Sequence, residues 1–465
     1  MAYVQSFGAA ETVTGSCHLL QIKQGPNILV DCGMFQGKGE AHSSDHFDFV
    51  AKEVDILLIT HAHLDHVGRI PKLFIDGFDG RVIALRATME LAEVVLLDSA
   101  KIAEEDYATS LKKARRRGDE SEVKKPLYTK EDVQMVFDAN IQYAEYDKPI
   151  TLGKNVQVTF RNAGHILGSA TLQIDFEEQD QSKTIVFSGD IGNLNDLVMP
   201  SPAIVKHADA LYIESTYGDR DHRSLEASVE EFREAVVNTL KNQGNVIIPS
   251  FAIERTQELL VLIKQMYYDK TLPPCKVFLD SPMAIKATKI YDRYRASLND
   301  SAQALFAKDG SVFDFPYLSY SVTAADSMAI NEEESGCIII AGSGMCTGGR
   351  ILHHFKHRLW NARNHILFVG FQAQGTLGRL LVDGAEEVRI YREEIKVRAN
   401  ISMINGFSAH ADQSEMLHWM AQFENLGNVF LIHGEPDKQA IFKEVIEAKL
   451  HKPTHIVKYA EKIGL

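Results

Sequence analysis

The chain has 465 residues, 45% of them hydrophobic and 24% charged, which is ordinary for a globular protein and longer than one core usually serves. We therefore expect two domains. No apolar run reaches the roughly eighteen residues of a membrane span, and the start lacks a basic-then-apolar signal, so we expect a cytoplasmic protein without membrane contact. The formal net charge of −14 argues against a broad polyanion-binding surface, but not against a local site. The five cysteines form no CxxC pair, which favours reduced thiols over a disulfide framework.

Three segments with strand character open the chain, near residues 3–7, 18–23 and 27–31. The third ends in Asp31, which Cys-Gly follows. A carboxylate at that position either holds a metal-binding histidine in the required tautomer or initiates a turn. The residues alone leave both interpretations open.

The next segment, residues 57–71, reads LLITHAHLDHVGRIP, and the rest of the chain is organised around it. Its apolar run is typical of a buried strand, and the run ends abruptly in four side chains that can bind a metal: His61, His63, Asp65 and His66. Imidazole and carboxylate are ligands that zinc or manganese accepts. We therefore predict a metal site here rather than a polar loop with chance histidines.

A helix and a basic stretch follow. Apolar spacing predicts the helix over residues 87–100, and residues 110–126 read SLKKARRRGDESEVKKP. The cations of this stretch could contact nucleic acid. Such a run is more often the solvated face of a helix or a mobile loop, and we favour that interpretation.

Two further metal candidates lie downstream. His165 stands in a glycine-flanked loop between strand-like runs, and Asp190 directly follows the buried strand in TIVFSGD, where glycine allows close backbone approach. Each alone is weak evidence, because an aspartate before glycine at a strand end is commonly just a turn. Together with the first cluster they supply the missing ligands.

From residue 228 to 369 helices and buried strands alternate, which predicts a doubly wound parallel sheet. Residues 342–350, GSGMCTGGR, can cradle phosphate with backbone N–H groups, but no GK[ST] follows, so we do not expect a nucleotide. The candidates for gripping phosphate in this region are Ser250, Arg255, Ser343 and Arg350. Helix capping and surface arginines are the alternative interpretation of these four.

Short strands return after residue 390, and two more histidines with polar neighbours follow. His410 lies in NGFSAHADQ, and His433 ends the strand in NVFLIHGEP. The strand-end position and the flanking glycine distinguish His433 from scattered surface histidines. Because metal candidates lie on both sides of the alternating segment, we expect the chain to leave one site and return to it, as it does around an inserted domain.

These motifs resemble those of a known family. HAHLDH, the isolated AGH, the strand-end SGD and the terminal IHG are similar to the motifs of the metallo-β-lactamase fold, and ESTYGD and SAHAD resemble those of its β-CASP subgroup of nucleic-acid nucleases. That subgroup includes ribonuclease J and the endonuclease of pre-mRNA 3′-end processing. The resemblance implies an α/β protein. Its metallo-β-lactamase αββα sandwich would be built from residues 1–215 and 393–465, with a β-CASP domain, a doubly wound parallel sheet, inserted at residues 216–392.

The resemblance also implies a role for each candidate residue. His61, His63 and His165 would hold one zinc ion, Asp65, His66 and His433 the other, and Asp190 would bridge them. The residues expected to take part in catalysis are Asp31 as the supporting carboxylate, Asp65, and the pair Glu214 and His410, with His410 as general acid.

The implied activity is hydrolysis of single-stranded RNA to 5′-phosphate and 3′-hydroxyl ends by water activated between two zinc ions, with manganese as an alternative. Histidine at position 433 is the choice of RNA-acting rather than DNA-acting members. We expect internal cleavage, with 5′–3′ exonuclease action as an alternative, because the chain lacks the extra C-terminal domain of ribonuclease J-type enzymes. A homodimer is also expected.

Two other functions fit parts of the sequence. A binuclear hydrolase of the thioesterase or lactonase type would use the same metal ligands, but the large inserted segment and the Glu214–His410 pair argue against a small substrate. A non-catalytic RNA-binding scaffold would have lost ligands, whereas all seven positions are filled here.

Overall fold

The computed structural model describes residues 2–37, 42–178 and 180–465. The chain divides into two compact units. Unit 1 comprises residues up to Leu194, Ser201–Asp221 and His410–Leu465, and unit 2 comprises Asn195–Pro200 and His222–Ala409. Unit 2 is therefore inserted into the sequence of unit 1.

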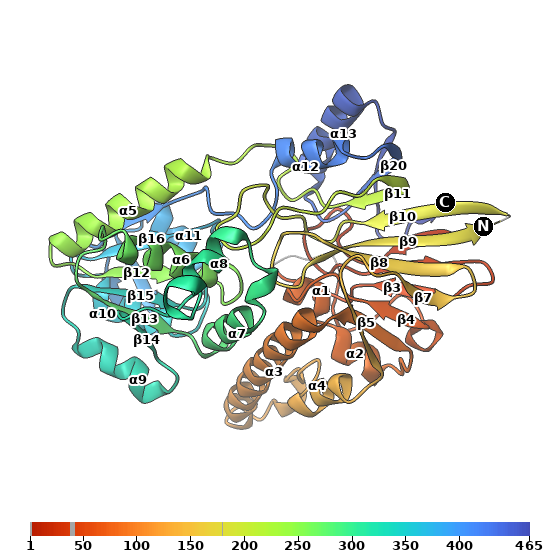
Figure 1. Cartoon of the computed structure of the whole chain (residues 1–465). Helices are drawn as coiled ribbons and strands as arrows, with labels where there is room; N and C mark the ends of the chain where they lie inside the picture. The colour runs from red at the N-terminus through yellow and green to blue at the C-terminus, as the bar shows by residue number, and fades with distance from the viewer. Residues whose placement is uncertain (1, 38–41, 179) are drawn as a thin grey trace. The chain divides into compact units, whose positions relative to one another are not determined.

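Unit 1 contains two seven-stranded sheets (Figure 1). The first sheet has the spatial order β22 (Lys462–Gly464), β1 (Tyr3–Ser6), β2 (His18–Gln21), β3 (Asn27–Val30), β4 (Ile56–Leu58), β5 (Arg81–Leu85) and β6 (Ile141–Ala144). The second has the order β21 (Thr454–Ile456), β20 (Asn425–Leu431), β11 (His207–Ile213), β10 (Gln181–Phe187), β9 (Ala170–Glu178), β8 (Val156–Asn162) and β7 (Ile150–Gly153).

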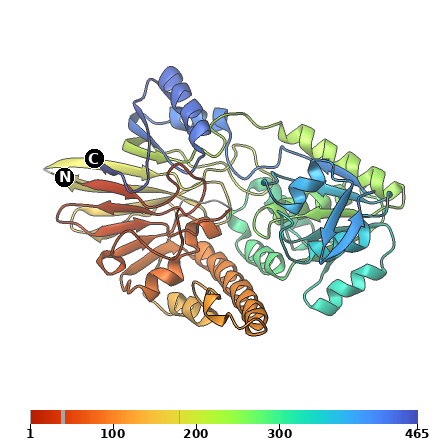
Figure 2. The same ribbon diagram turned by 180° about the vertical axis from the view of Figure 1, so that it is seen from behind.

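Each sheet of unit 1 has a parallel half and an antiparallel half. Strands β3 to β6 are parallel in the first sheet, and β10, β11, β20 and β21 are parallel in the second. The chain ends meet in the antiparallel half of the first sheet, where β22 pairs with β1 in the register Tyr3↔Gly464, and the two termini lie side by side in both views (Figures 1 and 2).

The core of unit 1 follows the two-residue alternation of its strands. In β10, Ile185 and Phe187 pack into the core between the sheets, while Val186 faces the other way, toward the helices α12 (Gln413–Ala421) and α13 (Pro436–Leu450). The remaining helices of unit 1 cover the first sheet: α1 (Leu64–Val67), α2 (Ile70–Ile75), α3 (Arg86–Arg115) and α4 (Lys130–Phe137), with short 3₁₀ turns at Ala51–Glu53 and Glu120–Glu122. The order helix, sheet, sheet, helix confirms the expected αββα sandwich.

Unit 2 is built on a six-stranded parallel sheet. Its spatial order is β14 (Leu318–Tyr320), β13 (Lys276–Asp280), β15 (Cys337–Ala341), β12 (Val246–Pro249), β16 (His365–Phe368) and β19 (Asn400–Met403). The α-helices are α5 (Leu225–Lys241), α6 (Arg255–Tyr268), α7 (Pro282–Arg293), α8 (Asp300–Asp309), α9 (Ala324–Ala329), α10 (Ile351–Arg358) and α11 (Leu377–Val382), with 3₁₀ turns at Arg295–Ser297 and Ile330–Glu332. A separate hairpin joins β17 (Glu387–Ile390) to β18 (Glu393–Lys396).

Both faces of this parallel sheet are covered, so its central strands are apolar throughout. Every residue of β15 is buried, and Ile339 packs with Phe355 of α10 on one side. The arrangement confirms the predicted doubly wound sheet.

Two details of the fold differ in extent from the sequence expectation. Helix α3 continues to Arg115, fifteen residues past the predicted end, and β19 pairs with β16 in unit 2. Apart from Asn195–Pro200, the compact units change at residues 221/222 and 409/410, and the domain limits 215/216 and 392/393 stay a prediction. No helix within the described residues is long and apolar enough to cross a membrane.

Candidate metal centre

The parallel halves of both sheets in unit 1 end at the candidate site. Asp31 follows β3 and His61 lies three residues beyond β4, whereas Asp190, Glu214 and His433 each follow a strand of the second sheet. Strands β10, β11 and β20 are adjacent and parallel, so their carboxyl ends deliver these side chains to one edge. This topology brings together residues that lie as far apart in the sequence as Asp31 and His433.

The first donor set contains three histidines and one carboxylate. His61 Nε2 and His165 Nε2 each lie 3.1 Å from His63 Nδ1, and Asp190 Oδ2 lies 3.3 Å from His61 Nε2 and 3.6 Å from His165 Nε2. All four donor atoms lie within 4.8 Å of one another. His63 and Asp65 flank the start of α1, so the turn from loop to helix separates the first donor set from the second.

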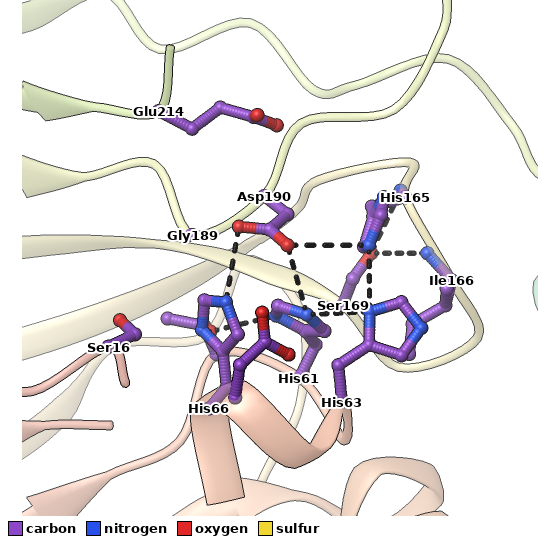
Figure 3. A network of polar contacts seen from close by, with 12 residues as sticks. Ser16, His61, His63, His66, His165, Ile166, Ser169, Gly189, Asp190 and Glu214 are labelled. Carbon is purple, nitrogen blue, oxygen red and sulfur yellow. Dashed lines mark hydrogen bonds and ion pairs between the residues drawn. The ribbon is translucent and has the colours of Figure 1, made fainter. Parts of the chain in front are cut away.

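The second donor set contains Asp65, His66 and His433. His66 Nε2 lies 3.3 Å from His433 Nε2, and His433 Nε2 lies 3.5 Å from Asp65 Oδ2. Asp190 also reaches this set, with Oδ1 3.3 Å from His66 Nε2 and 3.7 Å from His433 Nε2. One carboxylate therefore contacts both sets, with a different oxygen toward each (Figure 3).

The residues of both sets fit divalent cations. Ligand atoms of a tetrahedral zinc site with bonds of about 2.0 Å lie about 3.3 Å apart, close to the separations seen here. Asp190 is 2% exposed, and its Oδ1 accepts no hydrogen bond within the described chain, although a buried carboxylate oxygen normally has a donor. Imidazole nitrogens as close as 3.1 Å need a shared cation or proton between them. The chemistry and the geometry of the donors agree.

Asp31 orients His66. Its Oδ2 lies 2.7 Å from His66 Nδ1, while the backbone N–H and the hydroxyl of Thr60 donate to its two oxygens at 2.8 Å each. Asp31 and His433 both have positive φ, 60° and 50°, which is uncommon outside glycine and often marks functional positions. The turn interpretation and the supporting-carboxylate interpretation of Asp31 are thus compatible.

Glu214 and His410 form a pair beside Asp190. His410 Nδ1 lies 3.0 Å from Glu214 Oε2, and the backbone N–H of Ile191 donates to Glu214 Oε1 at 2.7 Å. Asp190 Oδ2 lies 3.9 Å from His410 Nδ1. Figure 3 shows Glu214 and Asp190 entering the site from adjacent strand ends.

Burial and nearby carboxylates shift the pKa values of the histidines at the site in different directions. Desolvation lowers the pKa of His63 to about 3 and that of His165 well below its usual value, so both imidazoles are neutral, as metal ligands must be. Desolvation also opposes the charged form of His66, but the carboxylates of Asp190 and Asp31 outweigh it and raise the pKa of His66. For His410 burial is outweighed by Glu214 first and then by Asp190 and Asp65, which raise its pKa to about 9.

The four phosphate candidates belong to unit 2, whereas both donor sets belong to unit 1. Ser250 and Ser343 follow the adjacent parallel strands β12 and β15, and the Ser250 N–H donates to the Ala341 carbonyl at 3.0 Å. The guanidinium of Arg350 bonds to Asp280 at 2.7 Å and to two backbone carbonyls, and that of Arg255 pairs with Glu254 and Glu258. The structure therefore groups the serines at one sheet edge and gives both arginines carboxylate partners.

Sequence reasoning missed two hydroxyl partners of the site. Thr60 Oγ1 contacts Asp31 and lies 3.1 Å from His61 Nδ1, and Thr216 Oγ1 lies 3.1 Å from His433 Nδ1. Thr60 lies two residues beyond β4 and Thr216 three residues beyond β11, each close to a candidate residue, which is the one signal the sequence offers for them.

Three family models match successive parts of the chain. The metallo-beta-lactamase superfamily domain matches residues 19–214, the Beta-Casp domain residues 256–381, and the Zn-dependent metallo-hydrolase RNA specificity domain residues 394–457. A solved structure, a protein of unknown function from Enterococcus faecalis V583, covers all of both chains with a TM-score of 0.56 at 13% identity, which supports the fold alone.

Curated relatives agree with these matches. The chain is 41% identical over 432 residues to Ribonuclease TTHA0252 of Thermus thermophilus, covering 93% of each protein. It is 30% identical to the transcription termination factor FttA of Methanocaldococcus jannaschii over 97% of this chain and 70% of that protein, and 29% identical to an RNase J-like protein of the same organism over 98% of each. The chain belongs to the β-CASP ribonuclease family of hydrolases with the metallo-β-lactamase fold.

Proposed function

We propose that this chain is a metal-dependent ribonuclease that hydrolyses phosphodiester bonds of single-stranded RNA and leaves 5′-phosphate and 3′-hydroxyl ends. The observation that carries the proposal is the pair of donor sets that share Asp190, with the Glu214–His410 pair beside them. The match to an RNA specificity domain and the ribonuclease among the relatives support RNA as the substrate class.

The proposed cofactors are two zinc ions, with manganese as the alternative. His61, His63, His165 and Asp190 would hold one ion, and Asp65, His66, His433 and Asp190 the other. Zinc is favoured because imidazole nitrogens predominate among the donors. When bound, the two ions would generate a nucleophile from water at neutral pH and balance the charge on the phosphoryl oxygens.

The remaining residues orient the ligands and move a proton. Asp31 accepts the Nδ1–H of His66, which leaves Nε2 directed at the second donor set. Glu214, fixed by the Ile191 N–H, accepts the Nδ1–H of His410, so that His410 Nε2 would carry the proton for the leaving 3′ oxygen. The proposed phosphate contacts are Ser250, Arg255, Ser343 and Arg350. To bind phosphate, each arginine would release the carboxylate with which it pairs in the structure.

The proposal extends to cleavage mode and setting. Internal cleavage is the proposed mode, with 5′–3′ exonuclease action as the alternative, and the proposed compartment is the cytoplasm, where the five cysteines, free in the structure, would stay reduced. A homodimer is the proposed assembly, and sedimentation of the purified chain tests it directly. The proposed domain limits are 1–215, 216–392 and 393–465.

The decisive experiment incubates the metal-reconstituted chain with end-labelled 5′-monophosphorylated RNA and with circular RNA. Internal cleavage predicts that both are cut, whereas a 5′ exonuclease spares the circle. His63→Ala is the matched control and should abolish cleavage and lower the metal content. Thioester and lactone substrates are assayed beside RNA, and turnover of those substrates with intact RNA would refute the proposal.

A further inference from the structure

The outer end of α3 carries a concentration of positive charge that the proposed chemistry does not use. We propose that this basic end binds the phosphate backbone of RNA whose scissile bond lies at the metal centre, so that it acts as an exosite for long substrates. The basic end consists of Lys112, Lys113, Arg115, Arg116, Arg117, Lys124 and Lys125. The inference rests on the proposed RNA cleavage and adds to it a second contact region.

The charge of this region contrasts with that of the whole chain. Seven cations face three anions between residues 112 and 125, while the chain carries a formal net charge of −14. All seven side chains are exposed. Arg115, Arg117 and Lys124 lie near the acids Glu120, Asp119 and Asp45, respectively. Within the described residues, no ion pair engages the other four: Lys112, Lys113, Arg116 and Lys125.

The spacing of the cations in and next to the last turn of α3 places them on the same side of the helix. Lys112 and the C-cap residue Arg116 are four residues apart, so these two like charges are neighbours at the helix end, and Arg117 follows in the turn. Ala114, on the opposite face, is 1% exposed, and the 3₁₀ turn Glu120–Glu122 packs against α3. The cationic face is therefore directed to solvent, where a polyanion can reach it.

Such an arrangement costs stability unless something offsets it. Like charges at four-residue spacing destabilise a helix by a few tenths of a kcal/mol per pair. The negative end of the helix dipole offsets part of this cost, but only within the last turn. Lys124 and Lys125 lie beyond the helix and gain nothing from the dipole. A bound phosphate backbone offsets the repulsion of the whole group.

Helix α3 also fixes the distance between this basic end and the metal centre. Near its start, the hydroxyl of Thr88 donates to the carbonyl of Gly168, three residues after His165. From Thr88 to Arg116 the helix rises about 40 Å, at about 1.5 Å per residue. In Figure 1 the helix extends past the strands of unit 1 to that end. Only an RNA of more than a few nucleotides can span this distance, so the exosite should discriminate by length.

The test compares the full, metal-reconstituted chain with the triple variant Lys112→Glu, Lys113→Glu, Arg116→Glu on a short oligonucleotide and on a long unstructured RNA. We expect the KM for the long RNA to rise about tenfold, with its kcat and both constants for the short RNA unchanged. The salt dependence of log(kcat/KM) for the long RNA should become shallower by about 2, since each lost phosphate contact removes about 0.7 from the slope for single strands.

The matched control reverses three exposed lysines elsewhere in unit 1: Lys148→Glu, Lys154→Glu, Lys206→Glu. It changes the net charge equally and should leave the KM for long RNA unchanged. A glutamine triple variant at positions 112, 113 and 116 avoids new negative charge at the helix end and should raise the same KM by a smaller factor. Unchanged long-RNA kinetics, or an equal effect on short RNA, would overturn the exosite.

The exosite and the proposed function fail in different ways. If the wild-type chain cleaves neither RNA, the proposed activity is wrong. Binding of the long RNA, followed by fluorescence anisotropy without cleavage, then still tests the exosite. Equal affinity of the wild-type and triple-variant chains in that measurement would overturn it.

Discussion

Asp31 Oδ2 lies 2.7 Å from His66 Nδ1, although 35 residues separate the two in sequence. The contact arises because β3 and β4 are parallel neighbours, so that the residue after one strand meets the loop after the other. The buried ring of His66 is thereby held with Nε2 toward Asp190. The position of one proposed metal ligand thus depends on a carboxylate that is not itself a ligand.

Substitution of Asp31 should accordingly weaken metal binding. We expect Asp31→Ala to lower metal affinity about 10- to 100-fold, the usual effect of removing a partner of a ligating histidine. Loss of this acceptor also leaves the buried Thr60 N–H unpaired, which should cost about 1–3 kcal/mol of stability. Metal content by elemental analysis and urea unfolding measure the two effects, with Asp79→Ala on the surface as the control. Full metal occupancy in Asp31→Ala would contradict the supporting role.

His410 should be needed for rate rather than for metal. Because Glu214 holds its Nδ1, we expect His410→Ala to lower kcat by about 10²- to 10⁴-fold while both ions stay bound. Glu214→Gln keeps the shape and the acceptor for the Ile191 N–H and should give a smaller loss in kcat. Rapid-quench kinetics and metal analysis of the same samples separate the effects. If His410→Ala loses metal, the general-acid assignment is wrong.

Much of the site was predictable because its motifs are local and stand at strand ends. The four donors between His61 and His66 lie within six positions, and Asp190 and His433 each follow an apolar run, a pattern visible without knowledge of the fold. Thr60 and Thr216 were missed because a single hydroxyl becomes a partner only after the sheets have assembled. Their contacts depend on tertiary structure, not on spacing.

The limits of the elements were harder to predict where apolar periodicity ends. Helix α3 continues over KIAEEDYATSLKKAR, where lysine, glutamate and arginine favour the helix through propensity without marking a buried face. Strand β22 has three residues, too few for their alternating burial to stand out in the sequence, and its pairing with β1 joins opposite ends of the chain. Neither feature has a local sequence pattern that predicts it.

Acid should destabilise the chain in part through His354 of unit 2. Arg358 Nη1 lies 3.3 Å from His354 Nδ1, and His354 Nε2 lies 2.7 Å from Asp280, which suits a neutral ring that accepts from arginine and donates to aspartate. Burial lowers the pKa of His354 below 6.5. The charge of Arg358 lowers this pKa further, whereas Asp280 opposes the decrease. The unfolded chain therefore binds more protons, so this contribution to stability is complete above pH 6.5 and is lost as the pH falls toward the folded-state pKa.

The measurement compares urea unfolding of the wild-type chain and His354→Gln from pH 7.5 down to pH 5. Glutamine cannot titrate, so the variant should lose less stability over this range, by up to about 1.4 kcal/mol per pH unit for one proton. The other histidines are common to both chains and cancel in the difference. Parallel pH profiles for the two chains would show that folding does not lower the pKa of His354.

The last prediction concerns Gly33, whose backbone approaches the metal-binding loop. A Cβ at this position would lie 1.5 Å from the carbonyl oxygen of Asp65, whereas real contacts of this kind are never much below 3 Å. Gly33→Ala therefore requires the loop of His63, Asp65 and His66 to move by more than an ångström. Displacements of that size can cost about 10²-fold in rate, so we expect the variant to lose metal and RNA cleavage together.

Gly153→Ala is the matched control in the same unit, because the added carbon would meet only the Pro26 ring, with Cδ at 3.3 Å and Cγ at 3.7 Å. That contact can relax by a small shift of the proline ring, so metal content and turnover should stay at the wild-type level. Circular dichroism of Gly33→Ala distinguishes local displacement from unfolding, since a displaced loop leaves the two sheets intact. Normal metal content and normal turnover in Gly33→Ala would mean that the strand end after β3 does not set the position of Asp65.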